Sequence, residues 1–287
     1  MKIILLGSNG QLGNEFEKFL SQKESIELHS FTHGDLDILN LQALIETFKI
    51  LNPDVVINCA AYTKVDKAEE EQDLTYKVNA IGAKNVAFAS YNVGAKVVYF
   101  STDYVFDGEK GKPYTEFDIP NPISIYGKSK FLGELFTKEF NSNHLILRIS
   151  WLYGISGGNF VKAVIKLEKE KHPLRVVDDQ IGCPTYTLDV VRQTSKLIEE
   201  QRVGLYHSSN EGIITWFSFT KEILSLLNLN TEVVPIKTEE YPTKATRPRY
   251  SVLENYLFNL ENINIMRSWK DALRDFVKNN KEQLLNG

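Results

Sequence analysis

The sequence predicts an α/β protein built on a doubly wound parallel sheet, with a smaller and discontinuous lobe toward the C-terminus. Short apolar runs alternate with segments of helical periodicity through the first half of the chain. This alternation is typical of parallel strands joined by right-handed helical crossovers. A glycine-rich segment at residues 7–13 follows the first apolar run directly. Together these observations favour a Rossmann-like arrangement of the sheet.

The predicted strands of the first half are continuous apolar runs, which parallel strands need because helices cover both faces of their sheet. They lie at residues 2–6, 27–31, 55–60, 96–101 and 145–149. The segments between them predict helices over residues 11–20, 41–51, 76–92 and 126–140. Asn40 is suited to cap the second helix, Pro53 stops that helix, and Gly94 follows the end of the third.

After residue 150 the alternation becomes less regular. Helices are predicted over residues 159–170, 187–201, 217–227 and 269–285, and strands over 174–177, 204–208 and 232–236. We expect residues 204–208 to return to the main sheet and residues 241–248 to form a loop. The predicted division is a first domain over residues 1–150, with a returning segment at about 185–210, and a second lobe over 151–287.

Composition narrows the classes of function. The chain has 287 residues, of which 43% are hydrophobic and 24% charged, as in ordinary globular proteins. A net charge of −4 without long basic runs argues against a nucleic-acid partner. No apolar stretch approaches the roughly 20 residues that cross a bilayer, and a strand that starts at residue 2 leads us to expect no signal peptide. Cys59 and Cys183 are expected to be free thiols, in keeping with a cytoplasmic location.

The glycine loop predicts a dinucleotide site. In Gly7-x-x-Gly10-x-x-Gly13, glycine permits a sharp turn and lets backbone N–H groups approach a pyrophosphate, while the start of the following helix favours negative charge. The spacing differs from the tighter G-x-G-x-x-G, and a bare glycine triplet also fits a structural turn. Its place between an apolar strand and an amphipathic helix favours the cofactor site.

The choice between NADH and NADPH depends on the end of the second strand. No acidic residue stands there for a ribose 2′-hydroxyl, and no arginine for a 2′-phosphate. Thr32 and His33 are suited to a phosphate, whereas Asp35 comes late in the turn. Asp37 and Ile38 are expected either to border the adenine or to form a solvated turn. The pattern favours NADPH, with NADH as the alternative.

A tyrosine and a lysine four residues apart predict acid–base chemistry. Tyr126 and Lys130 share one face of a predicted helix. An ordinary tyrosine has a pKa of about 10, and a nearby ammonium lowers that pKa, so the tyrosine is suited to protonate a carbonyl oxygen. Thr102, at the end of a predicted strand, is placed to polarise the same carbonyl. An isolated pair would more simply be the start of an amphipathic helix; the glycine loop and Thr102 favour catalysis.

These motifs, with further stretches over nearly the whole chain, resemble the extended short-chain dehydrogenase/reductases. Within that family the match is to reductases of dTDP-linked 4-keto-6-deoxy sugars. Residues 58–69, 101–108 and 179–185 carry the most specific parts of it. The other matching stretches are residues 7–13, 126–130, Arg148 with Trp151, and Arg247-Pro248.

The resemblance implies NAD(P)H-dependent reduction of the C4 ketone of dTDP-4-dehydro-L-rhamnose to dTDP-L-rhamnose, a step toward cell-surface polysaccharide. It implies a catalytic set of Thr102, Tyr126 and Lys130. Residues implied to bind the cofactor are Gly7, Gly10, Gln11, Leu12, Gly13, Asp37, Ile38, Ala60, Ala61, Tyr62, Thr63, Tyr126 and Lys130. Residues implied to bind the sugar nucleotide are Val65, Thr102, Tyr104, Tyr126 and Trp151. Asn79 is either an organiser of water near Lys130 or an ordinary polar residue of a helix.

Metal binding is one point of departure from the family. Some members are described as Mg²⁺-bridged dimers held by glutamates from two helices. Glu15 matches one of these glutamates, but Leu188 stands where the second is expected. We therefore predict no metal site, and either a monomer or a homodimer.

Two rival interpretations remain. A sugar-nucleotide dehydratase or epimerase has the same fold, and dehydratases use an Asp-Glu pair after the threonine. This chain has Asp103 followed by Tyr104, which favours plain reduction. The regulatory β subunit of methionine adenosyltransferase also resembles the family, binds NADP and keeps the Tyr/Lys pair. Turnover of a 4-keto sugar nucleotide would separate that non-catalytic subunit from a reductase.

Overall fold

A six-stranded parallel sheet forms the centre of the molecule. The structure is a computed structural model and describes residues 1–170 and 172–286. The strand order is β10-β5-β4-β3-β1-β2, which confirms the predicted fold class. The strands are β1 (Lys2–Leu6), β2 (Glu27–Phe31), β3 (Val55–Asn58), β4 (Lys96–Thr102), β5 (His144–Ile149) and β10 (Gly204–His207).

The order of strands reverses at β1, which pairs with β2 on one side and with β3 on the other. In the register of the sheet, Ile3 of β1 is paired with Leu28 of β2 and with Val55 of β3. In sheets of this kind ligands bind beyond the carboxyl ends of the strands at the point of reversal. The glycine loop, which follows β1, lies at that point.

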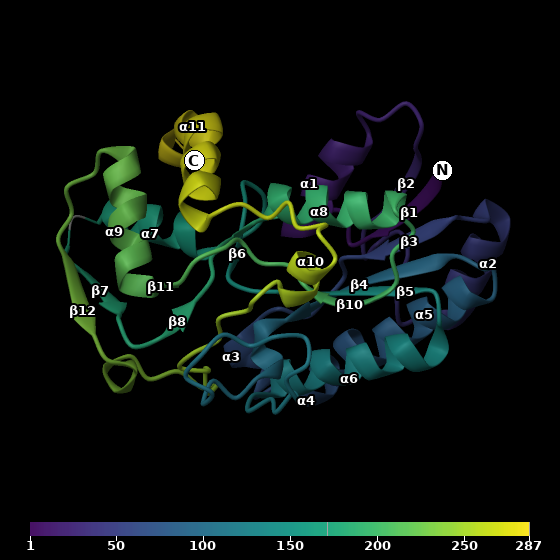
Figure 1. Cartoon of the computed structure of the whole chain (residues 1–287), viewed down its shortest axis with the longest axis horizontal. Helices are drawn as coiled ribbons and strands as arrows, with labels where there is room; N and C mark the ends of the chain where they lie inside the picture. Colours follow the sequence, from purple (N-terminus) through teal and green to yellow (C-terminus); the bar gives the residue numbers. More distant parts are fainter. Residues whose placement is uncertain (171, 287) are drawn as a thin grey trace.

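Helices cover both faces of the sheet (Figure 1). On one face α1 (Gln11–Leu20) and α8 (Thr187–Glu199) pack over the strands through a shared apolar cluster that includes Phe16 and Val190. On the other face lie α2 (Leu41–Leu51) and α5 (Ala83–Tyr91), whose Phe48 and Val86 meet the strands, with α6 (Ile125–Phe140) beside α5. The central strands are thus buried on both faces, as their continuous apolar sequences require.

Two predicted elements differ from the structure. The helix expected over residues 76–92 is instead α4 (Gln72–Tyr76), a π-helix over Lys77–Gly82, and α5. The third strand ends at Asn58 rather than residue 60, because the Asn58 side chain accepts a hydrogen bond from the Ala60 N–H at 3.1 Å and turns the chain. Both differences lie beside the glycine loop or α6, and π-helical turns are frequent at functional sites.

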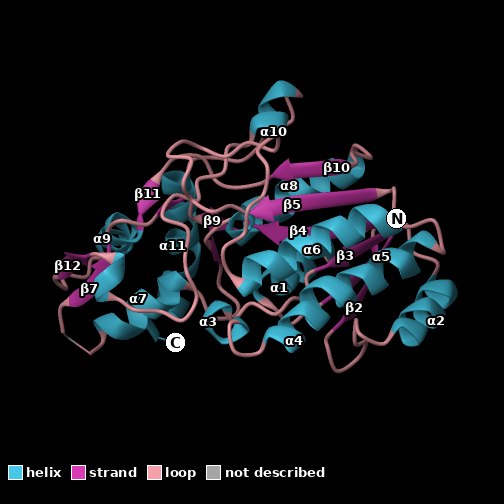
Figure 2. Ribbon diagram, turned by 90° about the horizontal axis from the view of Figure 1, so that it is seen from below, coloured by secondary structure: helices cyan, strands magenta, loops and turns pink. Residues whose placement is uncertain are grey.

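Most of the remaining elements form a lobe beyond the carboxyl ends of the strands, toward which the arrows of β4, β5 and β10 point in Figure 2. They are β6 (Leu152–Tyr153), α7 (Phe160–Glu168), β7 (Leu174–Val177), β8 (Ile181–Gly182), β9 (Thr185–Tyr186), β11 (Ile214–Thr215), α9 (Trp216–Leu227), β12 (Val233–Ile236) and α11 (Trp269–Asn286).

Three segments that flank this lobe pack with the main sheet or its helices. The predicted return of residues 204–208 to the main sheet is confirmed by the pairing of β10 with β5. The short helix α3 (Val65–Ala68) contacts α6, and α10 (Tyr256–Leu260) contacts β10.

The lobe has an apolar core of its own, rich in aromatic side chains. Phe276 of α11 is completely buried there, with its ring 5.3 Å from both Tyr153 and Tyr186 in edge-on packing.

No helix in the described part of the chain is long and apolar enough to cross a membrane.

Replacement of Phe276 by Ala is expected to lower the free energy of unfolding by about 3–5 kcal/mol, because a large buried ring is lost and a cavity remains. Lys278→Ala is the matched control, since this exposed residue lies two positions along the same helix and should change stability by less than about 0.5 kcal/mol. Urea unfolding measures both. Equal effects of the two substitutions would show that α11 does not cover an essential core.

Candidate active site

A cavity of about 440 Å³ lies where the carboxyl ends of the central strands meet the lobe. It opens beside the start of α1, the ends of β3, β4 and β5, and the start of α6. Its lining residues are Gly10, Gln11, Leu12, Asn58, Cys59, Ala60, Ala61, Thr63, Val65, Phe100, Ser101, Thr102, Asp103, Tyr104, Tyr126, Lys130, Ile149, Ser150, Trp151, Leu152, Gly158 and Trp216. The predicted catalytic residues and most of the predicted substrate and cofactor residues therefore share one cavity.

The glycine loop at one wall of the cavity fits a dinucleotide pyrophosphate. Gly7 has a φ of +72°, and a Cβ there would lie 2.8 Å from the Ala60 nitrogen. A Cβ on Gly13 would clash with the Gly7 carbonyl. Gly10 is the N-cap of α1 and offers no side-chain hydrogen bond to the first turn, which also lacks acidic residues. The N–H groups at this helix start are therefore left for a ligand, and the partial positive charge there favours an anion.

The segment from Leu152 to Asn159 lies across the start of α1. Gln11 donates from Nε2 to the Leu152 carbonyl at 3.0 Å and accepts from Asn159 Nδ2 at 3.0 Å. A Cβ on Gly157 would lie 3.2 Å from the Gln11 Cβ, so the two backbones approach closely. These contacts tie the lobe to the glycine loop and wall off that side of the cavity.

The loop after β3 is held in place by Asn79 of the π-helix. The Asn79 side chain accepts from the Tyr62 N–H at 2.8 Å and donates to the Tyr62 carbonyl and to Ser129 Oγ, each at 3.0 Å. These bonds occupy its amide group and join the loop to α6. The Tyr62 hydroxyl turns outward to Glu71. Asn79 thus shapes the cavity wall through the backbone of its neighbours.

The three predicted catalytic side chains come from adjacent elements. Thr102 ends β4, and its hydroxyl donates to Asp103 Oδ1 at 3.1 Å. Tyr126 lies in the first turn of α6, which begins after Ser124 because the Ser124 hydroxyl accepts from the Gly127 N–H at 3.1 Å. Lys130 follows one turn later and is buried. The end of a parallel strand and the start of a neighbouring helix thus direct all three side chains into one space.

Burial dominates the ionisation of the tyrosine and the lysine. It raises the pKa of Tyr126 to about 12, against a lowering effect of Thr102. It lowers the pKa of Lys130 to about 7, against a raising effect of Glu134. The expectation that a nearby ammonium lowers the Tyr126 pKa is therefore wrong for the chain without a ligand, because desolvation disfavours the phenolate more strongly. The tyrosine is held as the neutral phenol, which is the form that donates a proton.

Asp103 is a buried acidic residue that the sequence reasoning did not place among the site residues. Its Oδ1 accepts from Thr102, while Oδ2 has no hydrogen-bond partner within the described residues. Burial raises its pKa to about 6. The position of Asp103 directly after Thr102 is a sequence signal for a site residue. From the sequence, we interpret that signal only as the first member of the Asp-Glu pair of a dehydratase.

Two tryptophans close the lobe side of the cavity. The Trp151 and Trp216 indoles are stacked with their centres 3.3 Å apart and their planes within 6°. Trp151 has a φ of +44°, which is costly for a bulky residue, and a Cβ on Gly182 would lie 2.6 Å from its indole nitrogen. Trp216 was missed because it comes from the distant helix α9, and its sequence neighbourhood gives no signal.

A second cavity of about 530 Å³ lies next to the first, and Tyr104 and Trp216 line both. Its walls are mostly apolar side chains of α7 and β7, with Arg247 at one side. Arg247 is held by Asp66, to which Nη1 and Nη2 donate at 3.1 and 2.7 Å. The pair joins the loop at residues 241–248 to α3, one residue beyond Val65. The two adjoining cavities thus combine a part lined by Thr102, Tyr126 and Lys130 with a part lined mostly by apolar side chains.

The structure does not bring every predicted residue into the catalytic cavity. Asp37 and Ile38 lie beyond β2; Asp37 accepts from the Leu39 N–H at 2.9 Å, and Ile38 is buried in the apolar cluster under α2 and α5. Thr32 donates to Asp35 through both its N–H and its hydroxyl, while the His33 side chain is 82% exposed. Three other predicted cofactor residues lie next to the lining without being part of it, namely Gly7, Gly13 and Tyr62.

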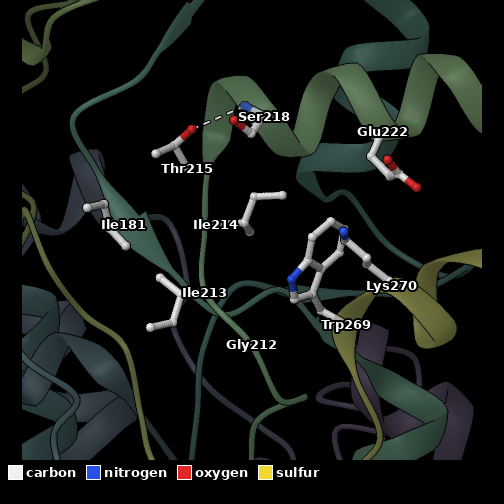
Figure 3. Close-up of a pocket in the computed structure, with 9 residues that line it drawn as sticks. All are labelled: Ile181, Gly212, Ile213, Ile214, Thr215, Ser218, Glu222, Trp269 and Lys270. Carbon is white, nitrogen blue, oxygen red and sulfur yellow. Dashed lines mark hydrogen bonds between the residues drawn. The ribbon is translucent and has the colours of Figure 1, made fainter.

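Glu15, which matches a metal-binding glutamate of some relatives, accepts a hydrogen bond from the Thr187 hydroxyl at 2.8 Å. Leu188 packs against the core of the lobe. A shallow groove elsewhere on the lobe, shown in Figure 3, is lined by Ile213, Ile214 and Trp269 among others and contains none of the predicted site residues. The Thr215–Ser218 hydrogen bond drawn there caps α9.

Comparison with known proteins agrees with this geometry. The family model described as the RmlD substrate binding domain matches residues 1–282. The chain is 41% identical to the spore coat polysaccharide biosynthesis protein SpsK of Bacillus subtilis, over 96% of this chain and 97% of that protein. It superposes with a TM-score of 0.96 on a dTDP-4-dehydrorhamnose reductase of Clostridium acetobutylicum (48% identity, 98% and 100% of the two chains). The TM-score is 0.95 with the Bacillus anthracis dTDP-4-dehydrorhamnose reductase in complex with NADP (46% identity, 97% of this chain and 99% of that chain). The chain therefore belongs to the RmlD substrate binding domain family.

Proposed function

We propose that this protein is an NAD(P)H-dependent oxidoreductase that reduces the C4 ketone of dTDP-4-dehydro-L-rhamnose to give dTDP-L-rhamnose. One observation carries the proposal: Thr102, Tyr126 and Lys130 open into the same cavity as the uncapped start of α1. A carbonyl in that cavity lies within reach of a proton donor and beside a dinucleotide site. The activity named for the similar structures is the same reduction.

The reaction needs a proton at the carbonyl oxygen as that oxygen gains negative charge. NADPH supplies a hydride to the carbonyl carbon when it is bound. Tyr126, held neutral by burial, donates its phenolic proton to the oxygen. Thr102, whose hydroxyl donates to Asp103 Oδ1 in this structure, would turn that proton to the same oxygen and orient the carbonyl. Lys130, as the ammonium, stabilises the phenolate left on Tyr126 and donates to the cofactor ribose.

We assign the cofactor to the first domain, residues 1–150. Gly10, Gln11 and Leu12 at the start of α1 are placed for the pyrophosphate, and the loop over residues 60–63 for the nicotinamide half. Asp37 and Ile38, beyond β2, would border the adenine. NADPH is the proposed cofactor, in line with the NADP complex of the Bacillus anthracis relative. The exposed His33, whose Nδ1 lies 3.6 Å from Asp37 Oδ1, is the side chain proposed to meet a 2′-phosphate.

We assign the sugar nucleotide mainly to residues 151–287. The hexose would fill the space between Val65, Tyr104 and Trp151 in the catalytic cavity, with its C4 ketone toward Thr102. The diphosphate and the thymidine would extend into the second cavity, where Arg247 supplies a cation and apolar side chains supply a surface for the base. The protein is proposed to act in the cytoplasm, as a monomer or a homodimer.

Two alternatives keep the same fold. A non-catalytic NADP-binding regulatory subunit would use the glycine loop without turnover. A dehydratase would need a second acid after Asp103, but Tyr104 stands there, with its ring packed edge-on at 5.7 Å from Tyr126. Reduction of another 4-keto-6-deoxy sugar nucleotide is the nearest variant of the proposal.

The purified protein is expected to oxidise NADPH when given dTDP-4-dehydro-L-rhamnose, and to do so faster than with other 4-keto-6-deoxy sugar nucleotides. Absorbance at the reduced-nicotinamide band measures turnover for each member of such a panel. A preparation that binds NADPH but leaves every member unchanged would support the regulatory alternative instead.

Replacement of Tyr126 by Phe should lower kcat by about 10²–10⁴-fold, because it removes the transferable proton and keeps the ring. The Kd for NADPH should change little. Tyr104→Phe is the matched control: it removes a neighbouring phenolic hydroxyl and should reduce kcat much less. Similar losses in the two variants would mean that Tyr126 is not the proton donor.

Trp151→Ala is expected to raise KM for the sugar nucleotide with little change in NADPH affinity, since the indole lies over the space assigned to the hexose. Both tryptophan and alanine are strained at a φ of +44°. The difference between the parent protein and the variant therefore reports the loss of the indole ring rather than a change in backbone strain. If Trp151 were instead a core residue, the melting temperature would fall steeply while KM of the folded fraction stayed the same.

A further inference from the structure

A buried ion pair lies behind the catalytic cavity, outside its lining. Arg148 of β5 donates from Nε to Glu134 Oε1 and from Nη2 to Glu134 Oε2, both at 2.8 Å. The two side chains are 3% and 0% exposed. Charge-assisted, two-point bonding of this kind fixes both the distance and the orientation of the carboxylate.

Glu134 shares a helix face with the catalytic residues. It follows Lys130 by four residues and Tyr126 by eight, so the three side chains lie along one side of α6. That side is pressed onto β4 at Gly133, where a Cβ would clash with the Tyr99 hydroxyl. Tyr99 donates to the Lys130 carbonyl at 3.3 Å, and the Lys130 ammonium lies 4.1 Å from the centre of the Tyr99 ring.

Arg148 ties this helix face to the strand ends that complete the site. It pairs with Ser101 across the sheet, so it is one register position from Thr102, and it precedes Trp151 by three residues. His207 approaches Arg148 at 3.5 Å. Burial and the arginine lower the pKa of His207 to about 3, so the neutral imidazole does not compete for the Glu134 carboxylate.

The titratable groups around Lys130 come from three elements. Glu134 and Tyr126 lie on its own helix, Tyr99 on β4, and Cys59 after β3. Burial raises the pKa of Tyr99, Tyr126 and Cys59, so these three remain neutral. Glu134 is the carboxylate among these groups, held in an ion pair with Arg148, and it opposes the effect of burial on the lysine.

We propose that Glu134 is a positioning residue for Lys130: Arg148 holds its carboxylate on the lysine's face of α6, and the carboxylate favours the charged form of Lys130. The proposed function assigns two roles to the ammonium form of Lys130, a hydrogen bond to the cofactor ribose and stabilisation of the Tyr126 phenolate. The inference therefore rests on the proposed function for the role of this charge. Neither residue of the ion pair lines the cavity assigned to the sugar and the nicotinamide.

The test is the pH dependence of NADPH binding to the full chain, followed by fluorescence titration between pH 5 and 9. Affinity should weaken as the pH rises through the pKa of Lys130, and Lys130→Met should lose that dependence. Glu134→Gln keeps the shape and removes the charge. It should move the midpoint downward by about half a unit or more, which is roughly a threefold or larger change in the acid dissociation constant. Glu134→Asp keeps the charge and should leave the midpoint near that of the parent protein.

The double variant Glu134→Gln with Arg148→Met removes both charges of the ion pair, so neither partner is left unpaired and the variant remains informative if the single variant does not fold. Its midpoint should also lie below that of the parent. A folded Gln variant with an unchanged midpoint, or a parent protein with no pH dependence, would overturn the proposal. No sugar nucleotide enters this titration, so a failure of the proposed reductase activity would be seen separately, as NADPH binding without turnover.

Discussion

The site depends on how tightly α6 packs against β4 and β5. A tyrosine and a lysine on a helix are useful for reduction only if they face the strand ends where a carbonyl and a cofactor meet. Gly133 lets the helix approach Tyr99, and the Glu134–Arg148 pair fixes its position against β5. A residue with a Cβ at the Gly133 contact would clash with the Tyr99 hydroxyl and push this part of α6, with Tyr126, away from β4. Proton transfer is sensitive to that geometry, because catalytic groups must lie within hydrogen-bonding distance.

Burial gives the site its chemical character and also has a cost. The pKa of Tyr126 is raised and that of Lys130 lowered because both groups are removed from water. The first effect keeps a proton available for a reduction. The second effect lowers the fraction of Lys130 that carries the charge needed to stabilise the phenolate, and the Glu134 carboxylate on the same helix face acts against it. The lobe adds to this dry environment through the stacked Trp151 and Trp216 and through the segment that Gln11 holds over the glycine loop.

Much of the fold and the centre of the site can be predicted from the sequence because the signals are local. Continuous apolar runs identify the strands, and parallel strands place Gly10, Thr102 and Tyr126 at one edge of a sheet. The parts that could not be predicted depend on contacts between distant segments. Trp216 reaches the cavity only through the packing of α9 in the lobe, and the interruption of the helix at residues 77–82 follows from the bonds that Asn79 makes to Tyr62. The direction of the Tyr126 pKa shift could not be predicted, because residue spacing indicates a neighbouring charge but not how far the side chain is removed from water.

The central claim is that this cavity delivers a hydride to C4 of the sugar and a proton from Tyr126 to its oxygen. The most direct measurement is a single turnover of dTDP-4-dehydro-L-rhamnose with NADPH carrying deuterium at the transferable nicotinamide position, followed by proton NMR of the product. The account predicts one deuterium at C4 of the hexose and none elsewhere on the ring. Product with hydrogen at C4, with deuterium at another carbon, or no product from cofactor-loaded protein would contradict it.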